Sequence, residues 1–239
     1  IYVLDKPEDA GQVESLLRGL NLTFGMPCRL AVTAENYGFA GASNLGASLA
    51  TAPVLLFLNS DVVPMGQGWL GRMLGFYAAT PEIGLLGPKL LFPDGSIQHA
   101  GLYFIGGIAK WWLNGVYCKG YPADWPAACT SREVPAVTGA CMMIARGKYE
   151  TVGGISEQYV IGDFEDTDLS LRCRRQGWRN WYMADAALMH MERASIEGHA
   201  SYSLAPVDAY NGWLHTKLWG ADIAALQEAF TGGALRQVA

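Results

Sequence analysis

Short apolar runs alternate with amphipathic stretches along the first part of the chain. The aliphatic runs at residues 1–4 and 29–33 predict two strands, and apolar positions spaced three and four apart predict a helix at 11–20 between them. Strand, helix and strand in this order are typical of a parallel sheet. The apolar run at 54–58 has no polar alternation, so it predicts a central parallel strand buried on both faces.

A segment rich in glycine and small residues precedes that third strand. Residues 35–44 predict a strand-to-helix loop, and residues 45–52 predict a helix of small side chains. Such a loop can be an ordinary tight turn, or it can bind a phosphate, because backbone N–H groups at a helix N-terminus can approach an anion. It matches neither the P-loop pattern nor the dinucleotide-binding fingerprint.

The pattern changes from parallel to antiparallel in the middle of the chain. A predicted helix at about 69–79 is followed by an apolar run at 84–92, a turn at 93–95 and a returning strand at 97–104, which together indicate a hairpin. Residues 105–133 are rich in glycine and aromatic residues with little periodicity. They predict a long loop, and long loops in compact domains are often functional.

The last part of the chain predicts two more strands and two more helices. A strand at 134–145 precedes an acidic segment that opens an amphipathic helix. A strand at 178–183 follows, then His190 in a loop, and a helical tail rich in aromatic residues spans about 207–230.

Composition and charge narrow the classes of function. The 239 residues are 51% hydrophobic and 16% charged, and no linker divides them, so we expect one large domain. The net charge of -5 offers no basic surface to a nucleic-acid backbone, so we expect no nucleic-acid partner. The five cysteines are odd in number and lack metal-ligand spacing, which favours a reducing, cytoplasmic setting. No apolar run approaches the length of about 20 residues that crosses a bilayer.

The acidic segment at residues 163–168 places four carboxylates within six residues. The unpaired N–H groups and the dipole at a helix start favour negative charge there. Two interpretations are open. Asp163 can cap the helix with the other carboxylates on a solvated first turn, or one of the carboxylates can carry out chemistry.

Asp61 and His190 are candidate metal ligands. Asp61 follows the apolar strand at 54–58, and open α/β sheets bind ligands at the carboxyl ends of their strands. An aspartate there can bind a Mg²⁺ or Mn²⁺ ion that bridges two phosphates, or it can simply stabilise a turn. His190 suits a metal ligand and a loop histidine equally well.

Seven motifs follow one another in a characteristic order. They are NYGFA with NLG at residues 36–46, LLFLNSD at 55–61, DGSIQHAG at 94–101, TGACMMI at 138–144, VGG at 152–154, FEDTDLSLR at 164–172 and HMERAS at 190–195. Together they resemble family 2 glycosyltransferases with a GT-A fold, of the rhamnosyltransferase or O-antigen biosynthesis type. The resemblance covers nearly the whole chain up to about Ser195.

The resemblance implies an α/β fold with a mixed, mostly parallel sheet flanked by helices. It implies a single glycosyltransferase domain over residues 1–239, with a nucleotide-binding half at 1–90, an acceptor and catalytic half at 91–200 and a helical tail at 201–239. The family normally begins with a further strand and helix, which are missing ahead of residue 1. Two interpretations are open: the chain is a fragment of a longer one, with other domains among its partners, or its site is incomplete.

The resemblance also assigns roles to the acidic segment and to the candidate metal ligands. Asp166 corresponds to the general base of inverting members. Asp61 and His190 correspond to ligands of a divalent metal, Mn²⁺ or Mg²⁺. Glu165 and Asp168 then orient the acceptor or the helix and transfer no proton, and Asp163 caps the helix.

Two larger groups of residues are implied to bind the donor and the acceptor. The nucleotide-binding group consists of Asp5, Asn36, Gly38, Phe39, Asn44 and Asn59. The group that contacts the donor or acceptor sugar consists of Gly139, Ala140, Glu165 and Trp111. Asn59 stands where the family has the first aspartate of its D-x-D motif, which lowers the local negative charge.

The implied reaction is an inverting transfer of a hexosyl or deoxyhexosyl group from a UDP- or dTDP-sugar to a glycan or lipid-linked acceptor. The implied location is the cytoplasm, including a peripheral position at the inner face of the membrane. Two alternatives stay open. A nucleotidyltransferase would need a basic, glycine-rich loop for a triphosphate, and no such loop is visible. A non-catalytic, GT-A-like sugar-binding or scaffolding domain of a larger protein would need no base.

Overall fold

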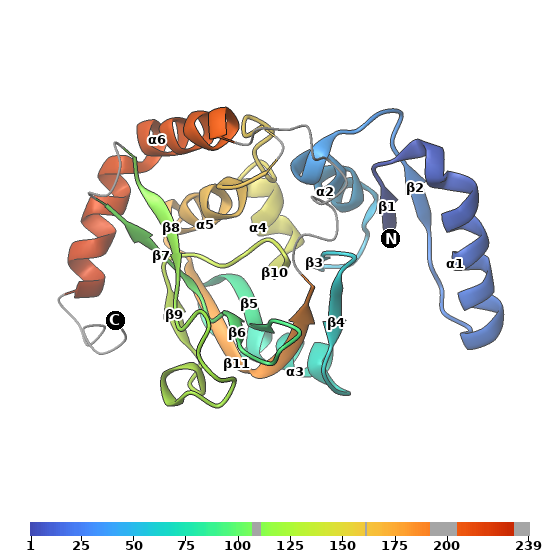
Figure 1. Cartoon of the computed structure of the whole chain (residues 1–239), viewed down its shortest axis with the longest axis horizontal. Helices are drawn as coiled ribbons and strands as arrows, with labels where there is room; N and C mark the ends of the chain where they lie inside the picture. Colours follow the sequence, from blue (N-terminus) through green and yellow to red (C-terminus); the bar gives the residue numbers. More distant parts are fainter. Residues whose placement is uncertain (107–110, 161, 192–204, 232–239) are drawn as a thin grey trace.

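The computed structural model describes residues 1–106, 111–160, 162–191 and 205–231. Their strands form one seven-stranded sheet and two separate two-stranded sheets. Helices pack on both faces of the large sheet, and the N-terminal unit lies beside it (Figure 1). Within the described residues, no helix is both long and apolar enough to cross a membrane.

The N-terminal unit has the predicted order of strand, helix and strand. After β1 (Tyr2–Leu4) come a 3₁₀ turn (Pro7–Asp9) and α1 (Ala10–Phe24), and the chain returns in β2 (Leu30–Val32). The strands β1 and β2 pair in parallel, as predicted. They form a sheet of their own, separate from the seven-stranded sheet.

The helix α2 (Gly38–Leu49) begins earlier than the sequence pattern predicts. Gly38 has a φ of +68°, and its N–H donates to the side chain of Asn36 at 2.9 Å, so the turn is completed there. The predicted glycine loop therefore forms the first turns of the helix. Its small residues let the helix approach β1, because a Cβ on Gly46 would lie 3.0 Å from Val3.

The seven-stranded sheet is mixed, as the fold class requires, but it is not mostly parallel. Its main path is β3 (Val54–Leu58), β10 (Cys141–Ala145), β5 (Ile83–Leu91), β11 (Arg179–His190) and β4 (Val62–Pro64), with β6 (Ile97–His99) paired to β5 and β9 (Arg132–Val134) paired to β11. Within the described part of this sheet, only β5 and β11 pair in parallel. From the second half of the chain, β10 inserts between β3 and β5 and is antiparallel to both, and β11 inserts between β5 and β4.

The strand β3 lies at an end of that path, so its predicted central, parallel position is wrong. It pairs antiparallel with β10, and only Leu55 is buried while Leu58 is 43% exposed. Its two faces do contact different hydrophobic clusters. Leu55 belongs to the cluster that contains Leu85, and Leu56 packs against the cluster that contains Leu86. The uninterrupted apolar pattern reflects these two contacts and not a central location.

The middle of the chain is more regular than a single long loop. The strand β6 pairs antiparallel with β5, as the hairpin prediction requires, whereas β7 (Leu102–Ile105) pairs with β8 (Leu113–Val116). A short 3₁₀ helix (Pro126–Ala128) follows β8. The single strand predicted at 134–145 is divided between β9 and β10, and residues 135–140 form the connection between them.

Two hydrophobic clusters on opposite faces of the large sheet form most of the core. Leu85 and Leu86 are successive residues of β5 that point to different clusters. The helix α3 (Trp69–Ala79) covers one face through Met73, and α5 (Glu165–Arg175) covers the other through Leu169. The short helix α4 (Arg146–Thr151) contacts β10.

The predicted helical tail is present as α6 (Ala205–Thr231) and contacts α5 (Figure 1). Trp219 is buried in that contact, whereas Trp213 is 42% exposed. The predicted loop position of His190 is wrong, because β11 extends to that residue. The described residues do not include residues 192–195 of the seventh motif or Lys110 of the predicted loop at 105–133.

Candidate active site

The acidic segment enters its helix through a tight backbone turn. Asp163 and Phe164 both have positive φ angles, 73° and 74°, which side-chain-bearing residues rarely adopt. Phe164 occupies the N-cap position of α5, so Asp163 lies one residue before the cap position predicted for it. The turn places Glu165 and Asp166 in the first helical turn, closer to its start than predicted.

The carboxylate of Asp166 is fixed by two backbone N–H groups. Gly139 donates to Oδ2 at 2.9 Å, and Thr167 donates to Oδ1 at 2.7 Å. Burial raises the pKa of Asp166 to about 6, and the N–H groups of Gly139 and Thr167 oppose that rise. A carboxylate that is ionised near neutral pH, and more basic than an exposed aspartate, suits the abstraction of a proton.

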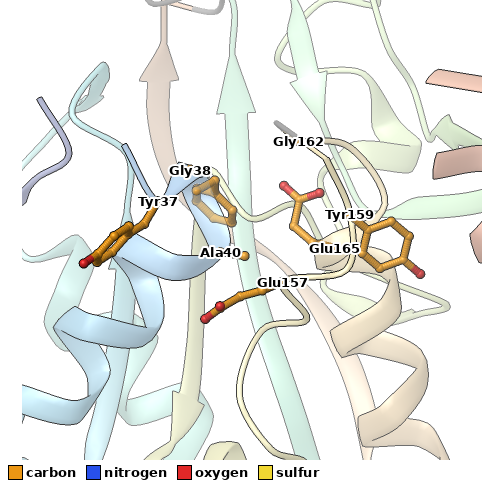
Figure 2. Close-up of a pocket in the computed structure, with 8 residues that line it drawn as sticks. Tyr37, Gly38, Ala40, Glu157, Tyr159, Gly162 and Glu165 are labelled. Atoms are coloured by element: carbon orange, nitrogen blue, oxygen red, sulfur yellow. The ribbon is translucent and has the colours of Figure 1, made fainter. Parts of the chain in front are cut away.

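Glu165 lines a pocket whose wall combines the starts of two helices. The pocket is lined by Tyr37, Gly38, Phe39, Ala40, Glu157, Tyr159, Gly162 and Glu165. Figure 2 shows the Glu165 carboxylate between the start of α2 and the loop before α5. Glu165 is 8% exposed, and its Oε2 has no hydrogen-bond partner within the described part of the chain. Burial and, next, the charge of Asp166 raise the pKa of Glu165 to about 8.

Asp168 has a different environment on the same helix. Its Oδ2 accepts from Arg172 Nε at 2.8 Å, and its Oδ1 accepts from Trp219 Nε1 at 2.7 Å. The side chain of Arg172 also donates to the carbonyls of Val152 and Gly154. Asp168 therefore links α5 to α6 and to the loop after α4, which agrees with a supporting role.

The two candidate metal ligands are neighbours. His190 pairs with Val62 across β11 and β4, and its Nε2 lies 3.3 Å from Asp61 Oδ1. Both side chains are largely buried, with 13% and 17% exposed. Cis ligands of one ion lie about 3 Å apart when bonds of about 2.1 Å meet at right angles. A carboxylate and an imidazole at this separation fit a Mn²⁺ or Mg²⁺ ion, although no group of three such ligands occurs among the described residues.

The turn at residues 138–140 joins the base candidate to the metal candidates. Gly139 binds Asp166 through its N–H, and the carbonyl of Ala140 accepts the N–H of Asn59 at 2.9 Å. A Cβ on Gly139 would lie 2.9 Å from the ring of Phe39 and 3.4 Å from Asp166 Cβ. A larger residue would have to displace the Phe39 ring, so glycine lets residues from four distant segments meet closely at this turn.

Other predicted nucleotide contacts lie around the start of α2. Asp5 follows β1, and its Oδ1 accepts the N–H of Tyr37 at 2.8 Å, next to Asn36. The amide of Asn44 is already engaged, because it bonds to Ile155, Glu157 and Tyr149. Nucleotide binding by these residues stays a prediction.

Trp111 is the candidate with the weakest connection to the acidic residues. A Cβ on Gly212 of α6 would lie 3.4 Å from its ring, so the indole packs on the tail helix. Its contact with a sugar stays a prediction.

Sequence reasoning missed several residues that support the site. His99 is buried, which lowers its pKa to about 4, and its Nε2 accepts the N–H of Thr138 at 3.3 Å. Asn211 of α6 bonds to both the N–H and the carbonyl of Val160, beside the pocket. The motif at 94–101 contained His99 but suggested no role for it, and Asn211 lay in a helix without any motif.

Comparison with known proteins identifies the chain. The sequence model of the family described as "Glycosyltransferase like family 2" matches residues 2–207. The chain belongs to glycosyltransferase family 2. This glycosyltransferase chain is 34% identical over 191 residues to the O-antigen biosynthesis protein RfbC of Myxococcus xanthus, covering 76% of the chain but 14% of RfbC. It therefore corresponds to a small part of that relative.

A second relative is a rhamnosyltransferase. The chain is 26% identical over 220 residues to N-acetylglucosaminyl-diphospho-decaprenol L-rhamnosyltransferase of Mycobacterium tuberculosis, covering 80% of the chain and 70% of the relative. The predicted resemblance to family 2 enzymes of the rhamnosyltransferase and O-antigen type is confirmed.

Solved structures confirm the fold of the glycosyltransferase chain. The crystal structure of GalNAc-T7 with UDP, GalNAc and Mn²⁺ superposes with a TM-score of 0.62 at 15% identity, over 81% of this chain and 37% of that one. At this identity the similarity establishes the architecture, and the chain has the GT-A fold.

Proposed function

We propose that this glycosyltransferase chain transfers a sugar with inversion from a UDP- or dTDP-sugar to a hydroxyl group of a glycan or lipid-linked acceptor. The observation that carries the proposal is the turn at 138–140, which binds Asp166 on one side and Asn59, two residues before Asp61, on the other. A base and a diphosphate-binding ligand must lie close together in such a reaction, because both act on one sugar.

Asp166 is the general base of the proposed reaction. Its carboxylate takes the proton of the acceptor hydroxyl as the oxygen attacks the anomeric carbon, and the bond to the nucleoside diphosphate breaks. A single displacement of this kind inverts the anomeric centre. Glu165, with its higher pKa, is largely protonated at neutral pH and donates a hydrogen bond to a sugar without taking the proton.

Asp61 and His190 are the proposed ligands of a Mn²⁺ or Mg²⁺ ion. The bound ion would neutralise charge on the departing diphosphate. Mn²⁺ is supported by its presence with UDP in the GalNAc-T7 structure. A deoxysugar donor and a lipid-linked acceptor are supported by the name of the mycobacterial relative, an L-rhamnosyltransferase acting on a diphospho-decaprenol.

The remaining predicted residues complete the proposed site. Asp5, Asn36, Gly38, Phe39, Asn44 and Asn59 contact the nucleotide, and Gly139, Ala140, Glu165 and Trp111 contact the donor or acceptor sugar. The chain acts as a single glycosyltransferase domain in the cytoplasm or at the inner face of the membrane, joined to other domains of a longer protein. The chain covers only 14% of RfbC, which supports the proposal that it is part of a longer protein.

A non-catalytic sugar-binding or scaffolding domain is the second candidate. One observation favours it: Asn59 replaces a carboxylate, and Asp61 and His190 have no third ligand nearby among the described residues. Such a domain would bind a nucleotide or a sugar and leave the donor intact.

Thermal unfolding of the complete chain with UDP-, dTDP- and GDP-sugars, with and without Mn²⁺, tests the proposal. We expect one nucleotide sugar to raise the Tm by several degrees only when Mn²⁺ is present. Asp61→Asn should abolish this metal-dependent rise in Tm. Asp185→Asn, at an exposed position of β11, is the matched control and should retain it. Metal-dependent binding without any transfer to acceptor would favour the non-catalytic candidate, and the absence of nucleotide binding would refute the proposed donor site.

A further inference from the structure

The strand β6 carries the third sequence motif, whose role the proposed reaction leaves open. The strand is held on both sides, because it pairs with β5 and because Ile97 exchanges backbone hydrogen bonds with Gly120 and Tyr121. Successive side chains of a strand point in opposite directions. His99 accordingly bonds to Pro88 and Thr138, while Gln98 reaches the ring of His190, 92 residues away in sequence.

The two contacts of Gln98 favour one orientation of its amide. Its Oε1 lies 2.7 Å from His190 Nδ1, and its Nε2 lies 3.5 Å from the backbone carbonyl of His190. In the flipped orientation, Oε1 would face that carbonyl, and two acceptors would meet without a hydrogen. Gln98 is 7% exposed, so water offers little compensation for such a mismatch.

This orientation decides which ring nitrogen of His190 carries the hydrogen. Since Oε1 of Gln98 can only accept, Nδ1 of His190 must donate. Nε2 is then the nitrogen that faces Asp61 Oδ1 at 3.3 Å, a position from which it can bind an ion shared with that carboxylate. A histidine that binds a metal through one nitrogen commonly donates the other N–H to a carbonyl or carboxylate oxygen.

The backbone of both metal candidates is fixed independently of Gln98. His190 is paired with Val62, and Met191 donates its N–H to the carbonyl of Asp61 at 3.1 Å. The rotation and tautomer of the imidazole are what remain to be determined. Gln98 is the described side chain that contacts Nδ1 and can determine both.

We propose that Gln98 is a positioning residue, which holds His190 in the Nδ1–H tautomer with Nε2 directed at the ion shared with Asp61. The metal part of this proposal rests on the proposed function, whereas the tautomer of His190 belongs to the metal-free chain. The two parts can therefore be tested separately.

The hydrogen on Nδ1 is detected by ¹H–¹⁵N NMR of the histidine rings in the metal-free complete chain. We expect His190 to be protonated at Nδ1 in the wild type. Gln98→Leu removes the acceptor, so the Nδ1–H signal should be lost and the ring hydrogen should lie on Nε2, opposite the Asp61 carboxylate. Gln98→Glu keeps an acceptor and should retain the Nδ1–H form. Gln12→Leu on the exposed surface of α1 is the matched control and should leave His190 unchanged.

The effect on the ion is measured by titrating the same four proteins with Mn²⁺ and following free Mn²⁺ by electron paramagnetic resonance. Loss of an outer ligand partner commonly weakens metal binding by about 10- to 100-fold, so Gln98→Leu should weaken it by this factor while Gln98→Glu binds within a few-fold of the wild type.

Three outcomes would count against the inference or its basis. An unchanged Nδ1–H signal in Gln98→Leu would overturn the positioning role. A changed tautomer with undiminished Mn²⁺ affinity would overturn its connection to the ion. If wild type itself binds no Mn²⁺, the proposed metal site is wrong, and the NMR result alone decides whether Gln98 fixes the ring.

Discussion

The first turn of α5 presents two faces with opposite electrostatics. On one face, Glu165 lines the pocket beside Asp166, and burial raises the pKa values of both carboxylates. Asp166 accepts hydrogen bonds from the backbone N–H groups of Gly139 and Thr167. Towards α6, Asp168 is paired with Arg172 and accepts from Trp219. Asp168 therefore differs in role from Asp166 and Glu165, which lie only two and three positions before it.

The comparison teaches how to separate structural from chemical carboxylates in an acidic cluster. A buried carboxylate that is neutralised by a guanidinium contributes to the fold, and its removal leaves an unpaired charge. A buried carboxylate without a cation destabilises the fold in its charged form, which is a common property of active sites. The variants below test this division, in order of decreasing expected effect.

Asp168→Ala should give the largest loss of stability. It leaves Arg172 buried without its carboxylate, and breaking a buried ion pair costs about 3–5 kcal/mol. The free energy of unfolding is measured by urea denaturation. Asp222→Ala, which breaks the more exposed pair with Arg175, should cost less than about 1 kcal/mol. Equal losses in the two variants would remove the distinction between the faces.

Trp219→Phe should give an intermediate loss. The variant keeps an aromatic ring but removes the N–H that donates to Asp168, and a hydrogen bond to a charged group contributes about 1.5–3 kcal/mol. Trp213→Phe on the exposed side of the same helix should change stability by about 0.5 kcal/mol or less. The same denaturation experiment compares them, and similar effects would show that α6 is not anchored through Asp168.

Glu165→Gln should cause no loss of stability and should instead raise it at high pH. The raised pKa means that Glu165 favours the fold when protonated, fully below its unfolded pKa of about 4.5, and that this contribution is lost as the pH rises through about 8. Glutamine does not titrate, so the variant should match wild type at pH 5 and have a Tm a few degrees higher at pH 9. Glu150→Gln on exposed α4 should show no such dependence. A Tm difference independent of pH would contradict the burial of an ionised Glu165.

Much of the site was predictable because its residues follow short motifs at the ends of regular elements. The positions of Asp61 after a strand and Asp166 at a helix start both agree with the structure. The register of the sheet was not predictable, because β9 and β10 enter it from far along the chain, at Arg132–Val134 and Cys141–Ala145, whereas β3 ends at Leu58. Local patterns do not specify which strands become neighbours over such separations.

The supporting contacts also escaped prediction for a physical reason. Gln98, His99 and Asn211 act through hydrogen bonds to residues that are distant in sequence, and their partners are mostly backbone groups. Almost every residue type supplies the same backbone N–H and carbonyl groups, so a backbone partner cannot be recognised from the sequence. The N-cap position of α5 was mispredicted because positive φ angles at Asp163 and Phe164 shift it by one residue, from Asp163 to Phe164.

The turnover of Asp166→Asn tests the central claim most directly. With the nucleotide sugar that stabilises the wild type, the variant should bind the donor within a few-fold of wild type yet transfer sugar about 10²- to 10⁴-fold more slowly. Wild-type turnover should fall as the pH drops through about 6, the raised pKa of the base. Turnover of the variant within a few-fold of wild type would contradict the assignment of Asp166 as the base.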